Sequence, residues 1–288
     1  MPLPKKVTLA DLRAVRTTGQ KLAMLTCYDY TTARIMHEVG VPLLLVGDSA
    51  ANVILGHPTT LPVPLSFMIQ ITAAVRRGAP DALLFGDMPF GSYQASVSQG
   101  VRNVVKMVQQ TNCDAVKLEV AGTHVPLIRT LADAGVAVFA HLGLKPQTVG
   151  LLGGYRFQGR TADEAEEILA LSLQMQDAGA AGLLLEAVPP EVAKAVVEKT
   201  SIPVIGCGAG PHCHSSVIVT QDGLGLTPTR PRFVPQLGDN GVVLRDAFTK
   251  YVQAVAGGTY PATEHDYVMP PAERQAFLDR VAAMDQPF

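Results

Sequence analysis

The feature that most constrains the fold is a series of eight short apolar runs along the chain. The runs read as continuous apolar segments rather than as an alternation of apolar and polar residues. Such segments are typical of parallel strands that are buried on both faces of a sheet. In chain order they are LAMLT, LLLVG, ALLFG, AVKLE, VAVFAH, GLLLE, IPVIG and SVIVT.

Helical patterns lie between these runs. Residues 94–110 carry valines at a spacing of three to four residues, which gives one apolar stripe. Residues 163–178 follow Thr161, a candidate N-cap, and are expected to stop at Gly179; another helix over 31–39 is expected to stop at the next glycine. Strand and helix therefore alternate, which predicts an α/β fold with a parallel sheet.

A closed barrel suits this alternation better than an open sheet does. Eight strands with their crossovers occupy about 250 residues in a (βα)8 (TIM) barrel, and this chain has 288 residues. A doubly wound sheet favours a glycine-rich turn after its first strand, but residues 26–29 contain no glycine. We predict one barrel domain over residues 1–260 with a short N-terminal helix, followed by an appendage over 261–288 that packs on the barrel or on a neighbouring subunit.

The composition limits the partners of the chain. Charged residues make up 17% of it, against a usual share of roughly a quarter, so we expect part of its surface to be buried in a homo-oligomer. A net charge of −2 does not favour nucleic acid, and no apolar run approaches the ~18 residues that span a membrane. The four cysteines are too scattered for a disulfide framework, and the N-terminus has no signal-peptide core, so we expect a reduced cytoplasmic protein.

Polar residues follow most of the apolar runs. In a barrel the C-terminal ends of all strands face one mouth, so these side chains are expected to surround one pocket. A single carboxylate after a strand is more often a helix cap, but a succession of them indicates a site. The residues are Asp48, Ser49, Asp87, Lys117, Glu119, His141, Glu186 and Asp222, the last of which could equally form a turn.

Clustered carboxylates repel one another unless a cation lies among them. Oxygen ligands select a hard cation, and Mg²⁺ typically takes one or two carboxylates, waters and substrate oxygens. An α-keto acid can chelate such an ion, which would acidify the neighbouring C–H. Glu186 follows three leucines, so burial could raise its pKa enough for it to act as the base.

Several strings resemble the ketopantoate hydroxymethyltransferase family, in one order from about Cys27 to Tyr267. They include CYDYTTARI, LLLVGDSAANVILGHPTTLPV, GDMPFGSY, AVKLE, HLGLKPQTV, GGYRFQGR and GLLLEAVP. The resemblance implies a barrel of the phosphoenolpyruvate mutase type that assembles into a homo-oligomer, typically a decamer. It also implies transfer of a hydroxymethyl group from 5,10-methylenetetrahydrofolate to 3-methyl-2-oxobutanoate through a Mg²⁺-stabilised enolate, giving ketopantoate for pantothenate and coenzyme A synthesis.

The resemblance also implies roles for individual residues. Asp48 and Asp87 match metal ligands for one Mg²⁺ per subunit, and Glu119 matches a carboxylate that acts on the metal directly or through water. All of the following are expected to hold the keto acid: Asp48, Ser49, Asp87 and Lys117. Glu186 matches the general base, and His141 and Tyr28 are expected to line the pocket.

Two alternatives remain at this level. Another Mg²⁺-dependent C–C enzyme of the phosphoenolpyruvate mutase and isocitrate lyase group would use similar chemistry, although its lyases generally carry a Lys-Lys-Cys-Gly-His loop that this chain lacks. A non-catalytic paralogue is suggested by residues 211–216, which read Pro-His-Cys-His-Ser-Ser where the family usually has an Asp-Gly-Gln run. A zinc site at Cys207–His214 is a weaker reading, because the usual C-x2-C-like spacing is absent.

Overall fold

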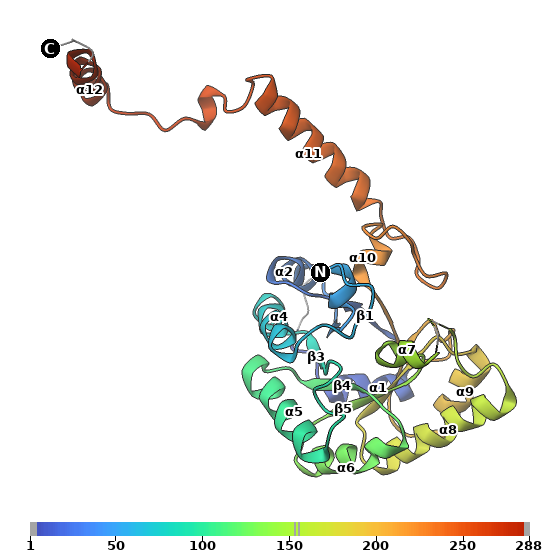
Figure 1. The fold of residues 1–288 in the computed structure, drawn as a ribbon. Coiled ribbons are helices and arrows are strands. Elements are labelled where there is room, and N and C mark those ends of the chain that lie inside the picture. The colour runs from blue at the N-terminus through green and yellow to red at the C-terminus, as the bar shows by residue number, and fades with distance from the viewer. Residues whose placement is uncertain (1–4, 153, 155, 285–288) are drawn as a thin grey trace. The chain divides into compact units, whose positions relative to one another are not determined.

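A computed structural model describes residues 5–284 of the chain, except residues 153 and 155. Eight parallel strands form a closed barrel in chain order, as the sequence predicts (Figure 1). The strands are β1 (Leu22–Thr26), β2 (Leu43–Val46), β3 (Leu83–Asp87), β4 (Ala115–Glu119), β5 (Val138–Gly143), β6 (Gly182–Glu186), β7 (Val204–Cys207) and β8 (Ser215–Ile218). The barrel closes where β1 pairs with β8, with Met24 opposite Val217.

One helix precedes the first strand, and others follow the strands and surround the barrel (Figure 1). The long ones are α1 (Leu9–Thr18), α2 (Tyr30–Glu38), α4 (Leu65–Gly78), α5 (Val97–Thr111), α6 (Val125–Asp133), α8 (Ala162–Asp177) and α9 (Pro190–Lys199). Short turns of helix are α3 (Ala50–Val53), η1 (Gly122–His124), η2 (Pro146–Thr148), α7 (Val149–Leu152) and α10 (Thr220–Gly223). The predicted cap of α8 is confirmed, because the Thr161 hydroxyl accepts a hydrogen bond from the Glu164 N–H.

Side chains alternate along each strand between the barrel interior and the layer under the helices. The interior cluster includes Phe85 and Phe139, whose rings meet edge to face with centroids 4.7 Å apart. Leu12 of α1 joins this cluster, and the Val7 N–H donates to the Asp81 carbonyl just before β3. The N-terminal segment therefore lies at the end of the barrel where the strands begin.

The same alternation places the polar residues in the mouth. In four consecutive strands, an apolar side chain faces the barrel interior. The residue two positions further along faces the same way and is polar. The pairs are Phe85 and Asp87, Ala115 and Lys117, Phe139 and His141, and Leu184 and Glu186. The interior is thus apolar where these strands begin and polar where they end.

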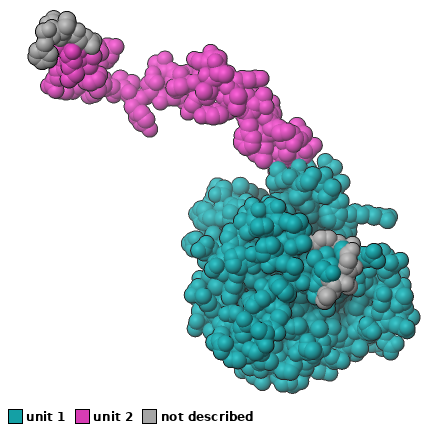
Figure 2. All heavy atoms as spheres, in the orientation of Figure 1, with its two compact units in different colours: residues 1–238 teal, residues 239–288 magenta. Residues whose placement is uncertain are grey.

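The chain divides into two compact units, residues 1–238 and 239–288 (Figure 2). The first unit contains the barrel. The second contains α11 (Asn240–Ala256), η3 (Thr263–His265) and α12 (Pro271–Met284). The boundary between the barrel domain and the appendage, which the sequence places at residue 260, stays a prediction. No helix among the described residues is long and apolar enough to cross a membrane.

Candidate active site

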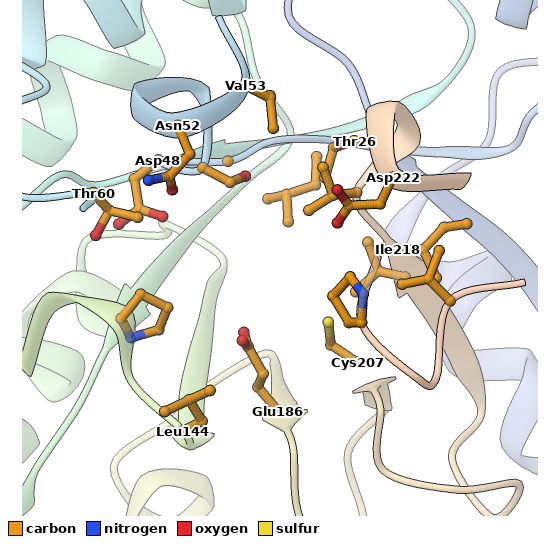
Figure 3. Close-up of a pocket in the computed structure, with 18 of the residues that line it drawn as sticks. Thr26, Asp48, Asn52, Val53, Thr60, Leu144, Glu186, Cys207, Ile218 and Asp222 are labelled. Atoms are coloured by element: carbon orange, nitrogen blue, oxygen red, sulfur yellow. The ribbon is translucent and has the colours of Figure 1, made fainter. Parts of the chain in front are cut away.

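A pocket of about 530 Å³ opens at the C-terminal ends of the strands (Figure 3). Its size lies within the range of roughly 300–1,000 Å³ that is usual for small-molecule sites. Most of the polar residues predicted from the strand ends line it: Asp48, Ser49, Asp87, Lys117, His141, Glu186 and Asp222. Two other predicted residues, Tyr28 and Glu119, do not line the pocket themselves and reach it through neighbours.

Asp87 and Lys117 form a buried ion pair at the base of this pocket. The Lys117 ammonium donates to both Asp87 oxygens, at 2.8 and 2.7 Å, and the Asp48 N–H donates to one of them at 2.9 Å. Burial alone would lower the pKa of Lys117, but the carboxylates of Asp87, Asp48 and Glu119 outweigh it and raise the pKa. Lys117 is therefore a fixed cation that offsets part of the negative charge of the mouth.

Ser49 and Tyr28 form a second polar contact beside Asp48. Their hydroxyl oxygens lie 2.8 Å apart. Tyr28 is buried behind Ser49, and burial raises the pKa of its phenol, so it remains a neutral hydroxyl. Either hydroxyl can be the donor, and the contact holds the Ser49 oxygen in place at the lining of the pocket.

Glu186 and His141 lie side by side at the ends of β6 and β5. Burial raises the pKa of Glu186 to about 7, although its side chain keeps 21% of its surface exposed to the pocket. The His141 Nε2 lies 3.3 Å from a Glu186 oxygen, and its Nδ1 lies 3.7 Å from Glu119. Burial, with the nearby Lys117 charge, lowers the pKa of His141 well below its usual range, so the imidazole is neutral.

The backbone around Glu186 is tightly constrained. Gly143 lies opposite it in the β5–β6 pair, and a Cβ at this glycine would overlap the Glu186 carbonyl oxygen. Ala187, the next residue, adopts a positive φ of 47°, which is uncommon for a residue other than glycine. The Ala187 N–H donates to the Cys207 carbonyl, which holds the strand end in place.

Gln147 of η2 connects the carboxylates, and the strand-end pattern did not predict it. Its amide group donates to an Asp48 oxygen at 2.9 Å and to the Met88 carbonyl at 3.0 Å, and accepts from the Tyr93 hydroxyl at 2.9 Å. Its backbone N–H donates to Glu119 at 3.0 Å. The only sequence signal was its place in the string HLGLKPQTV, shortly after β5.

The donor set fits an open site for a hard cation. Asp48 and Asp87 supply carboxylate oxygens from neighbouring strand ends, and one or two protein carboxylates are what Mg²⁺ usually takes. Within residues 5–284, gaps apart, no group of three or more His, Cys, Asp or Glu side chains is arranged as a metal cage. Water and substrate oxygens would therefore complete the coordination, and Asp48, Asp87 and Glu119 all stay predicted ligands.

The unusual segment at residues 211–216 lies away from the pocket. The His214 imidazole accepts from the N–H of Val204, the first residue of β7, and the Ser215 hydroxyl donates to the carbonyl of Leu22, the first residue of β1. The segment therefore ends where strands begin, and none of its residues lines the pocket. Its altered sequence gives no reason to expect a changed mouth.

The barrel has the same fold as solved enzymes that include a member of the phosphoenolpyruvate mutase and isocitrate lyase superfamily. Solved structures with this fold include 2,3-dimethylmalate lyase, with a TM-score of 0.58 and 18% identity over 98% of this chain and 99% of that one. Another is oxaloacetate acetylhydrolase, with a TM-score of 0.59 and 14% identity over 97% and 99% of the two chains. At such identities the likeness establishes the fold alone.

The chain belongs to the ketopantoate hydroxymethyltransferase family, whose sequence model matches residues 6–263. It is 41% identical to 3-methyl-2-oxobutanoate hydroxymethyltransferase of Heliobacterium modesticaldum, over 93% of this chain and 97% of the relative. The protein of that name from Frankia alni is 44% identical over 92% and 88% of the two chains. The predicted family and fold are confirmed, and the protein is a transferase.

Proposed function

We propose that the protein transfers a hydroxymethyl group from 5,10-methylenetetrahydrofolate to 3-methyl-2-oxobutanoate. The product is 2-dehydropantoate (ketopantoate), which serves pantothenate and coenzyme A biosynthesis. The observation that carries this proposal is a carboxylate of raised pKa, Glu186, in one pocket with the buried Asp87–Lys117 pair and Asp48. This combination suits removal of a proton beside the carbonyl of a bound anion.

The keto acid binds through the cationic and hydroxyl groups of the mouth. Lys117 offsets the charge of its carboxylate, and the Ser49 hydroxyl donates a hydrogen bond to one of its oxygens. Asp48 and Asp87 would hold one Mg²⁺ per subunit, with Glu119 acting directly or through water. When bound, this cation would polarise the keto group and make the neighbouring C–H more acidic.

Glu186 accepts the proton from C3 of the keto acid, and the neutral His141 lies beside it, with its Nε2 3.3 Å from a Glu186 oxygen. The C3 carbanion then bonds to the methylene carbon of the folate. Over the whole reaction that carbon exchanges its two bonds to folate nitrogens for one bond to C3 and one to a water oxygen. The protons lost from C3 and from water end on those two nitrogens, so tetrahydrofolate leaves.

The protein is further proposed to work in the cytoplasm as a homo-oligomer, the family's decamer being the expected form. Its low charge fraction supports burial of surface between subunits.

One assay tests the proposed reaction. The protein is incubated with 3-methyl-2-oxobutanoate and methylenetetrahydrofolate, with Mg²⁺ or with a chelator, and ketopantoate is measured. Product is expected only with the metal. In a parallel sample without folate, deuterium should exchange at C3 in D₂O. Exchange without product would contradict the folate donor, and absence of both would contradict the keto acid as substrate.

A further inference from the structure

The pocket extends beyond the groups that bind the keto acid. Figure 3 places Asp48, Asn52 and Thr60 on one side and Asp222 with Ile218 on the other, with the Glu186 carboxylate between the two sides. A pocket of about 530 Å³ belongs to the class that encloses drug-sized molecules, and a short branched keto acid is far smaller than that. The side around Asp222 is therefore free for a second, larger ligand.

This second side is mainly an apolar wall. It is formed by the end of β8 and the segment that follows α10, and includes Ile218, Val219, Pro228, Pro231, Phe233 and Val234. Phe233 lies against the backbone of Gly208, where an added Cβ would come within 2.6 Å of the ring, and part of the ring remains exposed. A flat, partly apolar ring system suits such a wall.

Asp222 supplies a carboxylate on this wall. The Thr227 hydroxyl donates to its Oδ1 at 2.7 Å, and its other oxygen accepts no hydrogen bond from the residues that the structure describes. Burial raises the pKa of Asp222, so the group is partly desolvated and gains from a donor. Cys207, Glu186 and Asp222 line the same pocket, and burial, followed by the charges of Glu186 and Asp222, raises the pKa of the Cys207 thiol.

We propose that Asp222 binds the reduced pterin of the folate co-substrate through its 2-amino group and ring N3–H. These two parallel donors match the two oxygens of a carboxylate, which together offer about four acceptor positions, so the Thr227 hydrogen bond is retained. The pterin ring lies on the apolar wall beside Phe233. This inference rests on the proposed function and adds the group that recognises the folate.

The test compares Asp222→Asn with Asp133→Asn, a matched change at an exposed carboxylate on α6. In Asp222→Asn, the N–H donors of the new amide would face an N–H donor of the pterin, so one of the two hydrogen bonds would be lost. KM for methylenetetrahydrofolate should rise about 10- to 100-fold in Asp222→Asn, the worth of a hydrogen bond to a charged group, and stay at the parent value in Asp133→Asn. Deuterium exchange at C3 without folate, which does not use this wall, should stay within about threefold of the parent rate.

A second experiment identifies the partner atoms. Tetrahydrofolate and its 2-desamino-2-methyl analogue, which lacks the amino donor, are bound to each variant in calorimetry. The parent and Asp133→Asn should bind the analogue about tenfold or more weakly, whereas Asp222→Asn should bind the two compounds alike. Thr227→Val, which keeps the carboxylate, should still distinguish them.

Three results would overturn the proposal. In the first, Asp222→Asn keeps the parent KM for folate. In the second, it distinguishes the two pterins as the parent does. In the third, exchange without folate falls as far as overall turnover, which would assign Asp222 a structural role. A parent protein that neither exchanges deuterium nor forms product contradicts the proposed function instead, and the calorimetry then still tests Asp222.

Discussion

Glu186 is the group in the mouth best suited to take a proton. Asp87 accepts hydrogen bonds from the Lys117 ammonium, and Asp48 accepts one from the Gln147 amide. Glu186 accepts no hydrogen bond from the described side chains. Glu186→Gln should therefore lower the rate of C3 deuterium exchange by roughly 10²–10⁴-fold while the keto acid still binds. Glu191→Gln, at an exposed position on α9, is the matched control. Should the Glu186 variant exchange as fast as the parent, the base lies elsewhere and His141 is next to test.

Burial of Glu186 also predicts a pH-dependent stability. Its pKa is raised from 4.5 to about 7, so the folded protein holds this proton more tightly than the unfolded chain does. Stability is therefore lost as pH rises through this window, by about 3 kcal/mol in all, and the neutral glutamine variant escapes the loss. Lys117 opposes the shift, and Asp48 adds to it. In urea unfolding with chelator present, the advantage of Glu186→Gln should grow between pH 5 and pH 7.5. A constant difference across that range would contradict the raised pKa.

Replacement of Gln147 tests whether metal binding by the carboxylates depends on the hydrogen bonds that orient them. Gln147→Leu keeps the approximate volume but removes the amide donor to Asp48 and the acceptor for Tyr93. We expect Mn²⁺, used as a probe for the metal, to bind about 10- to 100-fold more weakly, as is usual when a hydrogen bond to a ligand is lost. Gln109→Leu, at an exposed position on α5, should bind it normally. Equal Mn²⁺ affinity in both variants would show that Asp48 needs no orientation by this amide.

Gln147 and the carboxylates of the mouth differ in how readily the sequence identifies them as site residues. Asp87 and Glu186 occupy the last residues of their strands, and parallel strands in a barrel send such residues to one mouth whatever the loops do. Gln147 belongs to a single turn of 3-10 helix, and its direction depends on the path of the loop between β5 and α8. No periodicity predicts that path.

At the scale of elements, the apolar runs predicted every strand to within a few residues, but capping shifted the helices. The valine stripe predicted a helix over 94–110, whereas α5 spans Val97–Thr111. Ser96 is its N-cap and accepts a hydrogen bond from the Gln99 N–H. Gln94 lies before the helix because its side chain accepts from the Gly91 N–H. These local bonds compete with helix formation, and a pattern of apolar residues does not contain them.

Gly182 shows how closely the strands pack inside the barrel. It begins β6 opposite Phe139, and a Cβ there would overlap ring atoms of that phenylalanine, which is fully buried against Phe85. Gly182→Ala should therefore destabilise the fold by about 1–3 kcal/mol, the usual cost of overpacking a core. Gly122→Ala, where the nearest atom would be 3.8 Å away, is the control. Denaturant unfolding measures both, and equal stability would mean that the Phe139 ring moves aside without strain.

For the whole molecule, barrel closure was predictable because strand count, chain length and parallel pairing agree with one architecture. The C-terminal unit was harder to predict from the sequence. Its apolar residues do not form strand-like runs, and the sequence alone does not show which surface they pack against. Taken by itself, this unit has one buried residue, Gly241, among those described. It therefore has no core of its own, and the apolar side chains of α11 need another surface to cover them.

The state of assembly is the prediction that belongs to this scale. The apolar side chains on α11 include Phe248 and Val252, which are 64% and 63% exposed, and the chain as a whole is poor in charge. If α11 packs on a neighbouring copy, the protein should elute far above its chain mass of 30.5 kDa, and Phe248→Glu should shift it to smaller species. Thr249→Glu, which adds the same charge at the next exposed position of the helix, should leave the assembly intact. Light scattering after size exclusion measures the mass of each variant, and a parent protein that is monomeric at micromolar concentration would contradict the expected homo-oligomer directly.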